Sequence, residues 1–385
     1  MTEPSATDKP LVLVLMASAG AGHILAARAL EQALHTLAPH VEVEVLDVLT
    51  RANRFFRWLY GAGYLDLVRY SPAAFGWLYD AMDRPPARWS EALRTWFQGL
   101  HTRPVARYVR QRRPSLVINT HFLPAEIVAE LRRAGELHCP QIIVTTDYET
   151  HRMWVQEPAE RYYAATDLGQ TYLTTWGVPP ERVLVTGIPI RPGFATTLPQ
   201  DEARRRCGLD AARPVVLLLC GGFGVGPIAD VLRELVAMRA DAQVVAIAGR
   251  NEALRKRLEA QSRGASRPVR VVGFTDQMHE WMQAADLVVT KPGGLTVAES
   301  LACGLPLVII NPIPGQEERN SDYLLEQGAA IKVNNLRLIG YRVSGLLADP
   351  ARLQTLRTAA RTIARPQAAR DIATDALRLL SGRSI

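Results

Sequence analysis

The fold is decided by a stretch near the middle of the chain, Val215-Val-Leu-Leu-Leu-Cys-Gly-Gly-Phe-Gly-Val-Gly-Pro227. Its five leading apolar residues suit a parallel strand covered on both faces, and its glycines suit a tight turn into a helix that ends near residue 238. Further strands are expected, with helical stretches between them, at residues 244–248, 269–272, 287–290 and 307–310. This alternation predicts an α/β domain built on a doubly wound parallel sheet.

The N-terminal half has the same order of elements. An apolar run at residues 11–16 is followed by a glycine-containing turn at 18–22 and by an Ala/Leu-rich helical pattern at 24–37. Further strands are expected at residues 41–48, 116–119, 141–146 and 183–186. Proline and glycine then concentrate at residues 187–193, which indicates a domain boundary. We therefore expect domains over residues 1–190 and 191–365, followed by a C-terminal helix over 366–385 with the option of packing back on the first domain.

The composition is that of an ordinary globular protein. The chain has 385 residues, enough for two domains, of which 48% are apolar and 22% charged. No apolar run reaches the roughly 18 residues of a membrane-spanning helix, and residues 1–10 lack the pattern of a signal peptide. The four cysteines are widely spaced, which suits free thiols in a reducing cytoplasm.

The net charge of +7 is concentrated in one segment, residues 51–113. This basic aromatic segment holds 12 arginines against four acidic residues, with four of the seven tryptophans and five of the 11 tyrosines. Cations mixed with Trp and Tyr are typical of a surface that contacts an anionic membrane. The residues that we expect to contact the membrane are Arg51, Arg54, Arg57, Trp58 and Tyr60. Two alternatives are a helical insertion with inward-packed aromatics and a surface for single-stranded nucleic acid.

The glycine-rich turn at residues 221–227 is a candidate anion site. Its position between a strand and a helix lets backbone N–H groups approach a diphosphate, to which the helix N-terminus adds a favourable dipole. The turn lacks the Gly-Lys-Ser/Thr ending of a P-loop, and no acidic residue follows about 20 positions later as a dinucleotide site requires. The alternative is a tight turn with no ligand.

A more specific pattern occupies residues 273–320. It includes Gly273-Phe-Thr-Asp276, Lys291-Pro-Gly-Gly-Leu-Thr-Val-Ala-Glu299 and Pro314-Gly-Gln-Glu-Glu-Arg-Asn320. These motifs resemble the donor half of the family 28 glycosyltransferases, and most of all the monogalactosyldiacylglycerol synthases and processive diacylglycerol glucosyltransferases. The resemblance covers nearly the whole chain, since the segments 19–23 and 146–154 are also similar to that family. It implies the GT-B fold, in which two doubly wound domains face a central cleft.

The resemblance also implies a UDP-sugar site. By position, Glu299 would accept hydrogen bonds from both ribose hydroxyls, and Gln316 and Glu317 would contact the transferred sugar. The alternatives are a charged residue early on a helix and a polar loop that leads into one. The backbone and turn contacts would be Gly273 and Phe274 for uracil, Gly294, Leu295 and Thr296 for the diphosphate, and Gly222, Gly224 and Gly226 for its other side.

His23 is the candidate base that activates the acceptor. Histidine is the side chain most often used for this task near neutral pH, and His23 is expected on the first glycine turn, at the carboxyl end of a strand. The alternative is a capping or structural histidine. Gly22, Asp147 and His151 are further candidates for the acceptor cleft. The carboxylate that would orient a histidine is left open, and Asp47 ends the second predicted strand.

The resemblance implies an inverting transferase that moves a hexose from a UDP-sugar to the hydroxyl of a diacylglycerol-type lipid. It implies no cofactor and no metal, and the chain has no Asp-x-Asp motif. The enzyme is expected to lie peripherally on the cytoplasmic face of the cell membrane and to bind no nucleic acid. The alternatives are a GlcNAc transferase acting on a polyprenyl-linked acceptor and a non-catalytic protein that binds a nucleotide sugar or a lipid.

Overall fold

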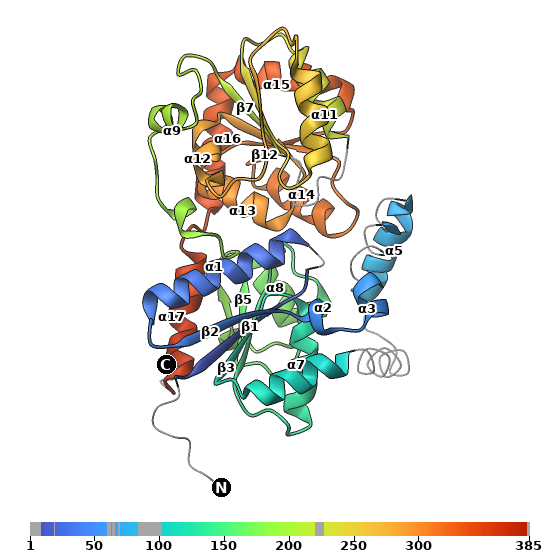
Figure 1. Cartoon of the computed structure of the whole chain (residues 1–385), viewed down its shortest axis with the longest axis vertical. Coiled ribbons are helices and arrows are strands. Elements are labelled where there is room, and N and C mark those ends of the chain that lie inside the picture. The colour runs from blue at the N-terminus through green and yellow to red at the C-terminus, as the bar shows by residue number, and fades with distance from the viewer. Residues whose placement is uncertain are drawn as a thin grey trace. The chain divides into compact units, whose positions relative to one another are not determined.

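We describe a computed structural model of the chain, over residues 9–18, 20–59, 63, 66–67, 70–83, 102–219 and 227–382. The chain divides into two compact units. The N-terminal unit comprises Met1–Pro192 and Gln367–Ile385, and the C-terminal unit comprises Gly193–Pro366. Each unit contains its own sheet (Figure 1).

The N-terminal unit alternates strands and helices. Its strands are β1 (Leu11–Met16), β2 (Glu42–Asp47), β3 (Leu116–Asn119), β4 (Gln141–Val144), β5 (Arg161–Ala164) and β6 (Val183–Val185). Its α-helices are α1 (Ala21–Leu37), α2 (Val48–Arg51), α3 (Arg54–Trp58), α5 (Pro72–Met82), α7 (Phe122–Arg133), α8 (Asp167–Thr175) and α17 (Ala368–Leu380), with a further helix over residues 102–112. Short 3₁₀ turns are η2 (Arg152–Trp154), η3 (Pro180–Arg182) and, at the boundary between the units, η4 (Pro192–Ala195).

The sheet of the N-terminal unit is parallel, with the strand order β2-β1-β3-β4-β5-β6. Every residue of β1 is buried, because alternate side chains enter two different cores. Val12 and Val14 pack with α1 and α17, whereas Leu13 and Leu15 pack with α7 and the helix over 102–112. The chain leaves β1 toward β2 and later returns to β3 on its other side. The switch point of the sheet therefore lies between β1 and β3.

The last helix of the chain belongs to the N-terminal unit. Ile372 and Ala373 of α17 are fully buried in the core that α1 covers, and the red α17 runs beside the blue α1 (Figure 1). The Tyr163 hydroxyl of β5 donates to the Asp375 carboxylate at 2.7 Å, and Arg161 Nε lies 3.5 Å from the same oxygen. Burial and this carboxylate raise the pKa of Tyr163, which keeps its hydroxyl protonated as a donor.

The C-terminal unit has the same kind of architecture. Its strands are β7 (Val215–Leu219), β8 (Gln243–Ile247), β9 (Val269–Val272), β10 (Leu287–Thr290), β11 (Leu307–Ile310) and β12 (Ala330–Val333). Its helices are α9 (Gln200–Arg206), α10 (Ile228–Val236), α11 (Glu252–Ser262), α12 (Met278–Ala284), α13 (Gly294–Ala302), α14 (Gln316–Glu326), η5 (Leu336–Leu338), α15 (Ile339–Leu347) and α16 (Pro350–Ile363). The strands form a parallel sheet in the order β12-β11-β10-β7-β8-β9, with the switch point between β7 and β10.

The predicted strands are present within two residues at each end, and the structure adds β5 and β12. Both additional strands are four residues long and include a charged residue, Arg161 at the start of β5 and Lys332 within β12. Such short runs carry little periodic signal, so neighbouring strands decide their conformation. Within the part of the chain that the structure describes, no helix is long and apolar enough to span a membrane.

Candidate active site

His23 lies at the switch point of the N-terminal sheet. The structure begins α1 at Ala21, so His23 stands in the first turn of the helix rather than in the preceding glycine turn, and Gly22 stands beside it. The end of β3 supplies Thr120 and the end of β4 leads to Thr146. Because the carboxyl ends of parallel strands meet at one edge, three segments that are distant in sequence converge there.

Two oxygen atoms hold the His23 ring. Its Nδ1 atom lies 2.8 Å from the Thr120 carbonyl oxygen and 3.1 Å from the Thr146 hydroxyl oxygen. A carbonyl only accepts hydrogen bonds, so Nδ1 carries the proton in neutral His23. The lone pair is therefore on Nε2, the tautomer that allows this atom to accept a proton. The Thr120 hydroxyl in turn donates to the His23 carbonyl at 3.2 Å, which ties β3 to the first turn of α1.

Burial keeps His23 neutral. Desolvation lowers its pKa from 6.5 to about 4, although the Thr120 carbonyl favours the charged form. A second imidazole, that of His121, meets the His23 ring edge-on with centroids 4.5 Å apart. The pKa of His121 is also lowered, by burial and then by the proximity of His23. The His121 Nδ1 atom accepts from Leu123 N–H and thereby caps α7.

Asp147 is connected to His23 through a tryptophan. The Trp154 Nε1–H donates to the Asp147 carboxylate at 2.9 Å, and both residues are buried. The centroid of the Trp154 ring lies 6.4 Å from that of His23 and 6.1 Å from that of Phe122. Asp147 therefore orients the tryptophan that packs beside His23.

His151 and Asp47 have local structural partners. The buried His151 ring accepts from Met153 N–H at Nδ1 and lies 3.0 Å from the Tyr79 carbonyl through Nε2. Asp47 caps α2 by accepting from Leu49 N–H at 3.0 Å, and it also accepts from Ser18 N–H at 3.2 Å. These contacts fix the loops around the switch point.

Sequence reasoning about the site omitted Thr120, His121 and the roles of Thr146 and Trp154. A usable signal existed for the first two residues, because they follow the strand predicted at 116–119 directly. Polar residues at the carboxyl end of a strand beside the switch point are candidates for a site. Trp154 carried no such signal, since its contact with His23 depends on the path of the chain after β4.

The candidate donor residues of the C-terminal unit follow the carboxyl ends of its strands. Gly294 opens α13 directly after the loop from β10, beside the switch point, with Leu295 buried and Thr296 half-buried. Glu299 lies farther along the same helix and is 6% exposed. An N-terminal helix turn offers unpaired backbone N–H groups and a positive dipole end, which suit a diphosphate. Gly222, Gly224 and Gly226 lie outside the described residues.

Glu317 joins the loop after β11 to the loop after β10. Its Oε2 atom accepts from Ile313 N–H at 2.8 Å, and a Cβ atom added at Gly293 would lie 3.9 Å from Oε1. Asn320 strengthens this junction by donating to the Pro292 carbonyl at 3.0 Å. Burial raises the pKa of Glu317, whereas Lys291 and the Ile313 N–H favour its charged form. Gln316 is the first residue of α14.

Phe274 follows β9 at the edge of the same sheet. Its ring is 54% exposed, and the Arg250 guanidinium carbon lies 4.4 Å above the ring centroid. This cation–π contact holds an exposed aromatic face beside Gly273. The structure thus brings the residues after β9, β10 and β11 to one edge of the C-terminal sheet.

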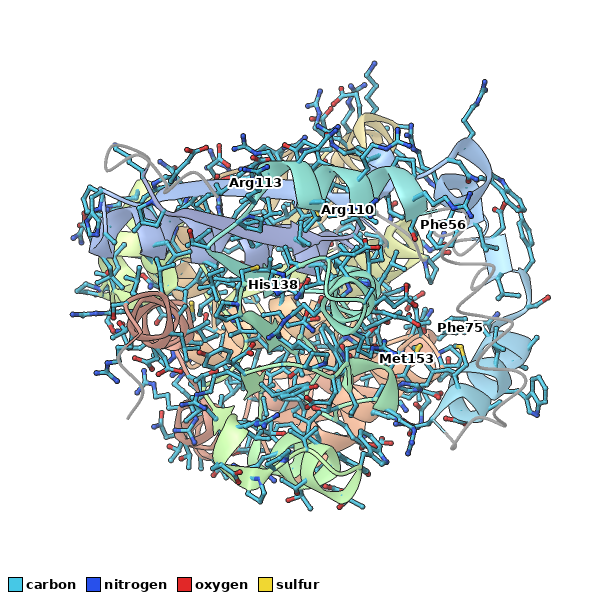
Figure 2. The ribbon with its side chains drawn as sticks, turned by 90° about the horizontal axis from the view of Figure 1, so that it is seen from below. Phe56, Phe75, Arg110, Arg113, His138 and Met153 are labelled. Carbon is cyan, nitrogen blue, oxygen red and sulfur yellow. The ribbon has the colours of Figure 1, made fainter. Side chains whose placement is uncertain are left out.

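The basic aromatic segment combines inward and outward side chains. Phe56, Phe75 and Tyr79 are buried, which agrees in part with the alternative of an inward-packed insertion. Figure 2 labels Phe56 and Phe75 on the inner side of α3 and α5. Among the described residues of this segment, the exposed large apolar side chains are Trp58, Leu59, Tyr70, Trp77, Leu78 and Met82, which we call the outer patch.

Two of the expected membrane arginines have partners within the protein. Arg57 donates to the Leu49 and Thr50 carbonyls at the end of α2, and the guanidinium of Arg51 lies 3.7 Å from the centroid of the Tyr108 ring. Arg54 and Trp58 are exposed. Tyr60 and residues 84–101 lie outside the described part of the chain.

Two family patterns match successive parts of the chain. The sequence pattern of the family described as monogalactosyldiacylglycerol (MGDG) synthase matches residues 23–190, and that of glycosyl transferases group 1 matches residues 228–363. A processive diacylglycerol beta-glucosyltransferase of Bacillus cereus is 30% identical over 262 residues, 68% of this chain and 67% of that protein. The chain belongs to the MGDG synthase family of glycosyltransferases. The resemblance expected from the motifs is therefore confirmed.

Other members of the family differ in how much of the chain they match. The protein of the same name from Bacillus subtilis is 34% identical over 249 residues, a segment that spans 65% of each chain. That from Bacillus cytotoxicus is 28% identical over 364 residues, 94% of this chain and 92% of the relative. The B. subtilis match thus spans just under two thirds of that relative, whereas the B. cytotoxicus match extends over both units.

Solved structures confirm the fold class. MurG of Acinetobacter baumannii is 18% identical, with a TM-score of 0.61 over 96% of this chain and 99% of that protein. HepE of Anabaena in complex with UDP is 16% identical, with a TM-score of 0.54 over 97% of both chains. At these identities the likeness shows the fold alone, and it is that of the GT-B glycosyltransferases expected from the sequence.

Proposed function

We propose that this member of the family transfers a hexose from a UDP-sugar to the hydroxyl of a diacylglycerol-type lipid, with inversion at the anomeric carbon. The observation that carries the proposal is the His23–Thr120 hydrogen bond, because it leaves the Nε2 lone pair of a neutral imidazole to accept a proton. The names of the relatives support the lipid acceptor, since three of them are processive diacylglycerol beta-glucosyltransferases.

In the proposed step the acceptor oxygen attacks the anomeric carbon while its proton passes to Nε2 of His23. A new C–O bond forms, the bond from the anomeric carbon to the β-phosphate oxygen breaks, and UDP leaves with the bonding electron pair. A neutral, unprotonated base is ready at physiological pH because burial keeps the pKa of His23 low. Thr120 and Thr146 act as positioning residues that hold the ring through Nδ1.

The C-terminal unit would bind the donor. Glu299 would accept hydrogen bonds from the two ribose hydroxyls, and Gln316 and Glu317 would bind the sugar. The N-terminus of α13 would stabilise the negative charge of the departing diphosphate without a metal. The remaining donor contacts are Gly273, Phe274, Gly294, Leu295 and Thr296, with Gly222, Gly224 and Gly226 on the other side of the diphosphate. Support comes from the described residues of this set, which all follow the carboxyl ends of strands of one sheet.

The outer patch would contact the cytoplasmic face of the cell membrane. Trp and Tyr side chains suit the headgroup region, and the exposed Arg54 suits anionic lipid. Arg51 and Arg57 contribute less to this contact than the sequence suggested, because Tyr108 and the end of α2 already engage them. Trp77 and Tyr70, each 73% exposed, take their place as the main interfacial residues.

The test is a matrix of donors and acceptors in anionic mixed micelles. UDP-glucose, UDP-galactose and UDP-GlcNAc are each offered with diacylglycerol and with a polyprenyl-diphosphate sugar, with and without EDTA. We expect EDTA-resistant hexose transfer to diacylglycerol, and a loss of about 100- to 10,000-fold in kcat for His23→Ala. GlcNAc transfer to the polyprenyl acceptor would replace the proposal by the alternative activity, and UDP binding without transfer to either would favour a binding protein.

A further inference from the structure

The helix that carries much of the outer patch is attached to the loop beside His23. On α5, Phe75 and Tyr79 face inward while Trp77 and Leu78 face outward. The Tyr79 ring packs on the His151 ring with centroids 4.4 Å apart, so the inner side of α5 meets the loop after β4. Figure 2 shows the two segments through the labels Phe75 on α5 and Met153 on the loop.

Hydrogen bonds strengthen this attachment. Because His151 Nδ1 accepts from Met153 N–H, Nε2 carries the proton of the neutral ring and donates to the Tyr79 carbonyl at 3.0 Å. Asp83, directly after α5, accepts from Arg152 N–H at 2.9 Å and lies 3.6 Å from His151 Nε2. The His151 side chain is 1% exposed, so its bond to the Tyr79 carbonyl is buried and costly to leave unmade.

The same short loop ends at the tryptophan of the site. The 3₁₀ turn capped by His151 leads directly to Trp154, which Asp147 orients and which packs beside His23. A continuous series of contacts therefore runs from α5 through His151 and Trp154 to His23. A displacement of α5 by one ångström or more would break the His151–Tyr79 bond or move the loop.

We propose that His151 is a positioning residue that couples docking of α5 on a membrane to the arrangement of Trp154 beside His23. The inference rests on the proposed function, since it assumes that α5 contacts lipid and that His23 is the base. A membrane that holds α5 in place also holds the loop in its ordered position. Transfer to an acceptor in a bilayer then exceeds transfer to the same headgroup dispersed as a monomer.

Two substitutions separate this coupling from simple capping. His151→Asn retains an acceptor near Nδ1 for Met153 N–H but is too short to donate to the Tyr79 carbonyl. The longer side chain of His151→Gln reaches toward the Tyr79 carbonyl but no longer accepts from Met153 N–H, the bond that caps the 3₁₀ turn. Trp77→Ser is the control, because it changes the outer patch and leaves the His151 contacts in place. Thermal unfolding identifies any variant whose N-terminal unit fails to fold, because all three substitutions lie in that unit. UDP affinity is the separate check that the C-terminal unit, the proposed donor site, is intact.

The measurement is the ratio of kcat/KM on diacylglycerol in anionic vesicles to kcat/KM on a short-chain, monomeric diacylglycerol. We expect His151→Asn to lower this ratio about fivefold, the effect of one hydrogen bond, while vesicle binding and the monomer reaction are retained. Trp77→Ser lowers vesicle binding itself. An unchanged ratio in His151→Asn, or an equal loss on both acceptors, would overturn the coupling.

A second measurement does not depend on turnover. Hydrogen exchange over residues 151–160 should slow when vesicles bind the wild-type protein and should not change in His151→Asn. If no acceptor is glycosylated, the proposed function fails, and this measurement still decides whether membrane docking of α5 orders the loop through His151. Equal protection in both proteins, or vesicle binding that leaves the loop unchanged in the wild type, would contradict it.

Discussion

The Nδ1 atom of His23 lies 2.8 Å from the carbonyl oxygen of Thr120, a residue 97 positions farther along the chain. β1 and β3 are neighbours in the sheet, so the helix that follows one strand meets the backbone that follows the other. The carbonyl selects one tautomer of the imidazole and directs its lone pair to Nε2. A backbone group performs this task here, and no substitution of the Thr120 side chain can remove that carbonyl.

Stability should depend on pH through His23. The folded-state pKa is about 4 and the unfolded value is 6.5, so between these pH values the unfolded chain binds a proton that the folded chain does not. Stability from this group is complete above pH 6.5 and falls as pH decreases to 4, by up to about 3 kcal/mol. His23→Gln should reduce this decrease in urea unfolding at pH 7 and 4.5. Identical decreases in both proteins would contradict the lowered pKa.

The Thr146 hydroxyl should matter for turnover more than for donor binding. It lies 3.1 Å from His23 Nδ1, so Thr146→Val removes one of the two oxygens that hold the ring. We expect kcat to fall about fivefold with unchanged UDP affinity, and Thr146→Ser to restore most of it. The matched control is Thr145→Ser, which retains the hydroxyl that bonds to the Tyr163 carbonyl. Equal kcat for Thr146→Val and wild type would remove this positioning role.

Glu299 should determine affinity for the nucleotide. A carboxylate that accepts from two ribose hydroxyls contributes two charge-assisted hydrogen bonds, so Glu299→Ala should weaken UDP binding at least about 100-fold. Calorimetry with UDP measures this loss. Glu318→Gln is the control, because Glu318 is exposed and accepts from Gly315 N–H at the start of α14. Comparable UDP affinity in Glu299→Ala and Glu318→Gln would remove Glu299 from the donor site.

Two tyrosines allow a matched test of the membrane surface. Tyr70 of the outer patch and Tyr341 of α15 are each 73% exposed, but they belong to different units. We expect Tyr70→Ser to weaken binding to anionic vesicles several-fold and Tyr341→Ser to leave it unchanged. Arg54→Gln should in addition reduce the salt dependence of vesicle binding, because salt screens its attraction to anionic lipid. Equal effects of the two tyrosine substitutions would contradict the assignment of the outer patch.

The sequence by itself determined the fold class and most of the strands. Continuous apolar runs such as residues 11–16 and 215–219 are compatible with few structures other than buried parallel strands, and the motifs at 273–320 resemble one family of enzymes. These are local signals. They specified the sheets, the order of elements and the residue types near each strand end without reference to distant parts of the chain.

Only the tertiary structure decided which hydrogen-bond partners each candidate site residue has. The His23 tautomer depends on Thr120 and Thr146, and the position of His151 depends on Tyr79, 72 residues earlier in the chain. The sequence predicts Asp147 and His151 as residues of the acceptor cleft, and the structure adds the partners of each, Trp154 for the first and the Tyr79 carbonyl for the second. Hydrogen-bond partners require atoms within about 3 Å, and long-range packing alone brings such atoms together.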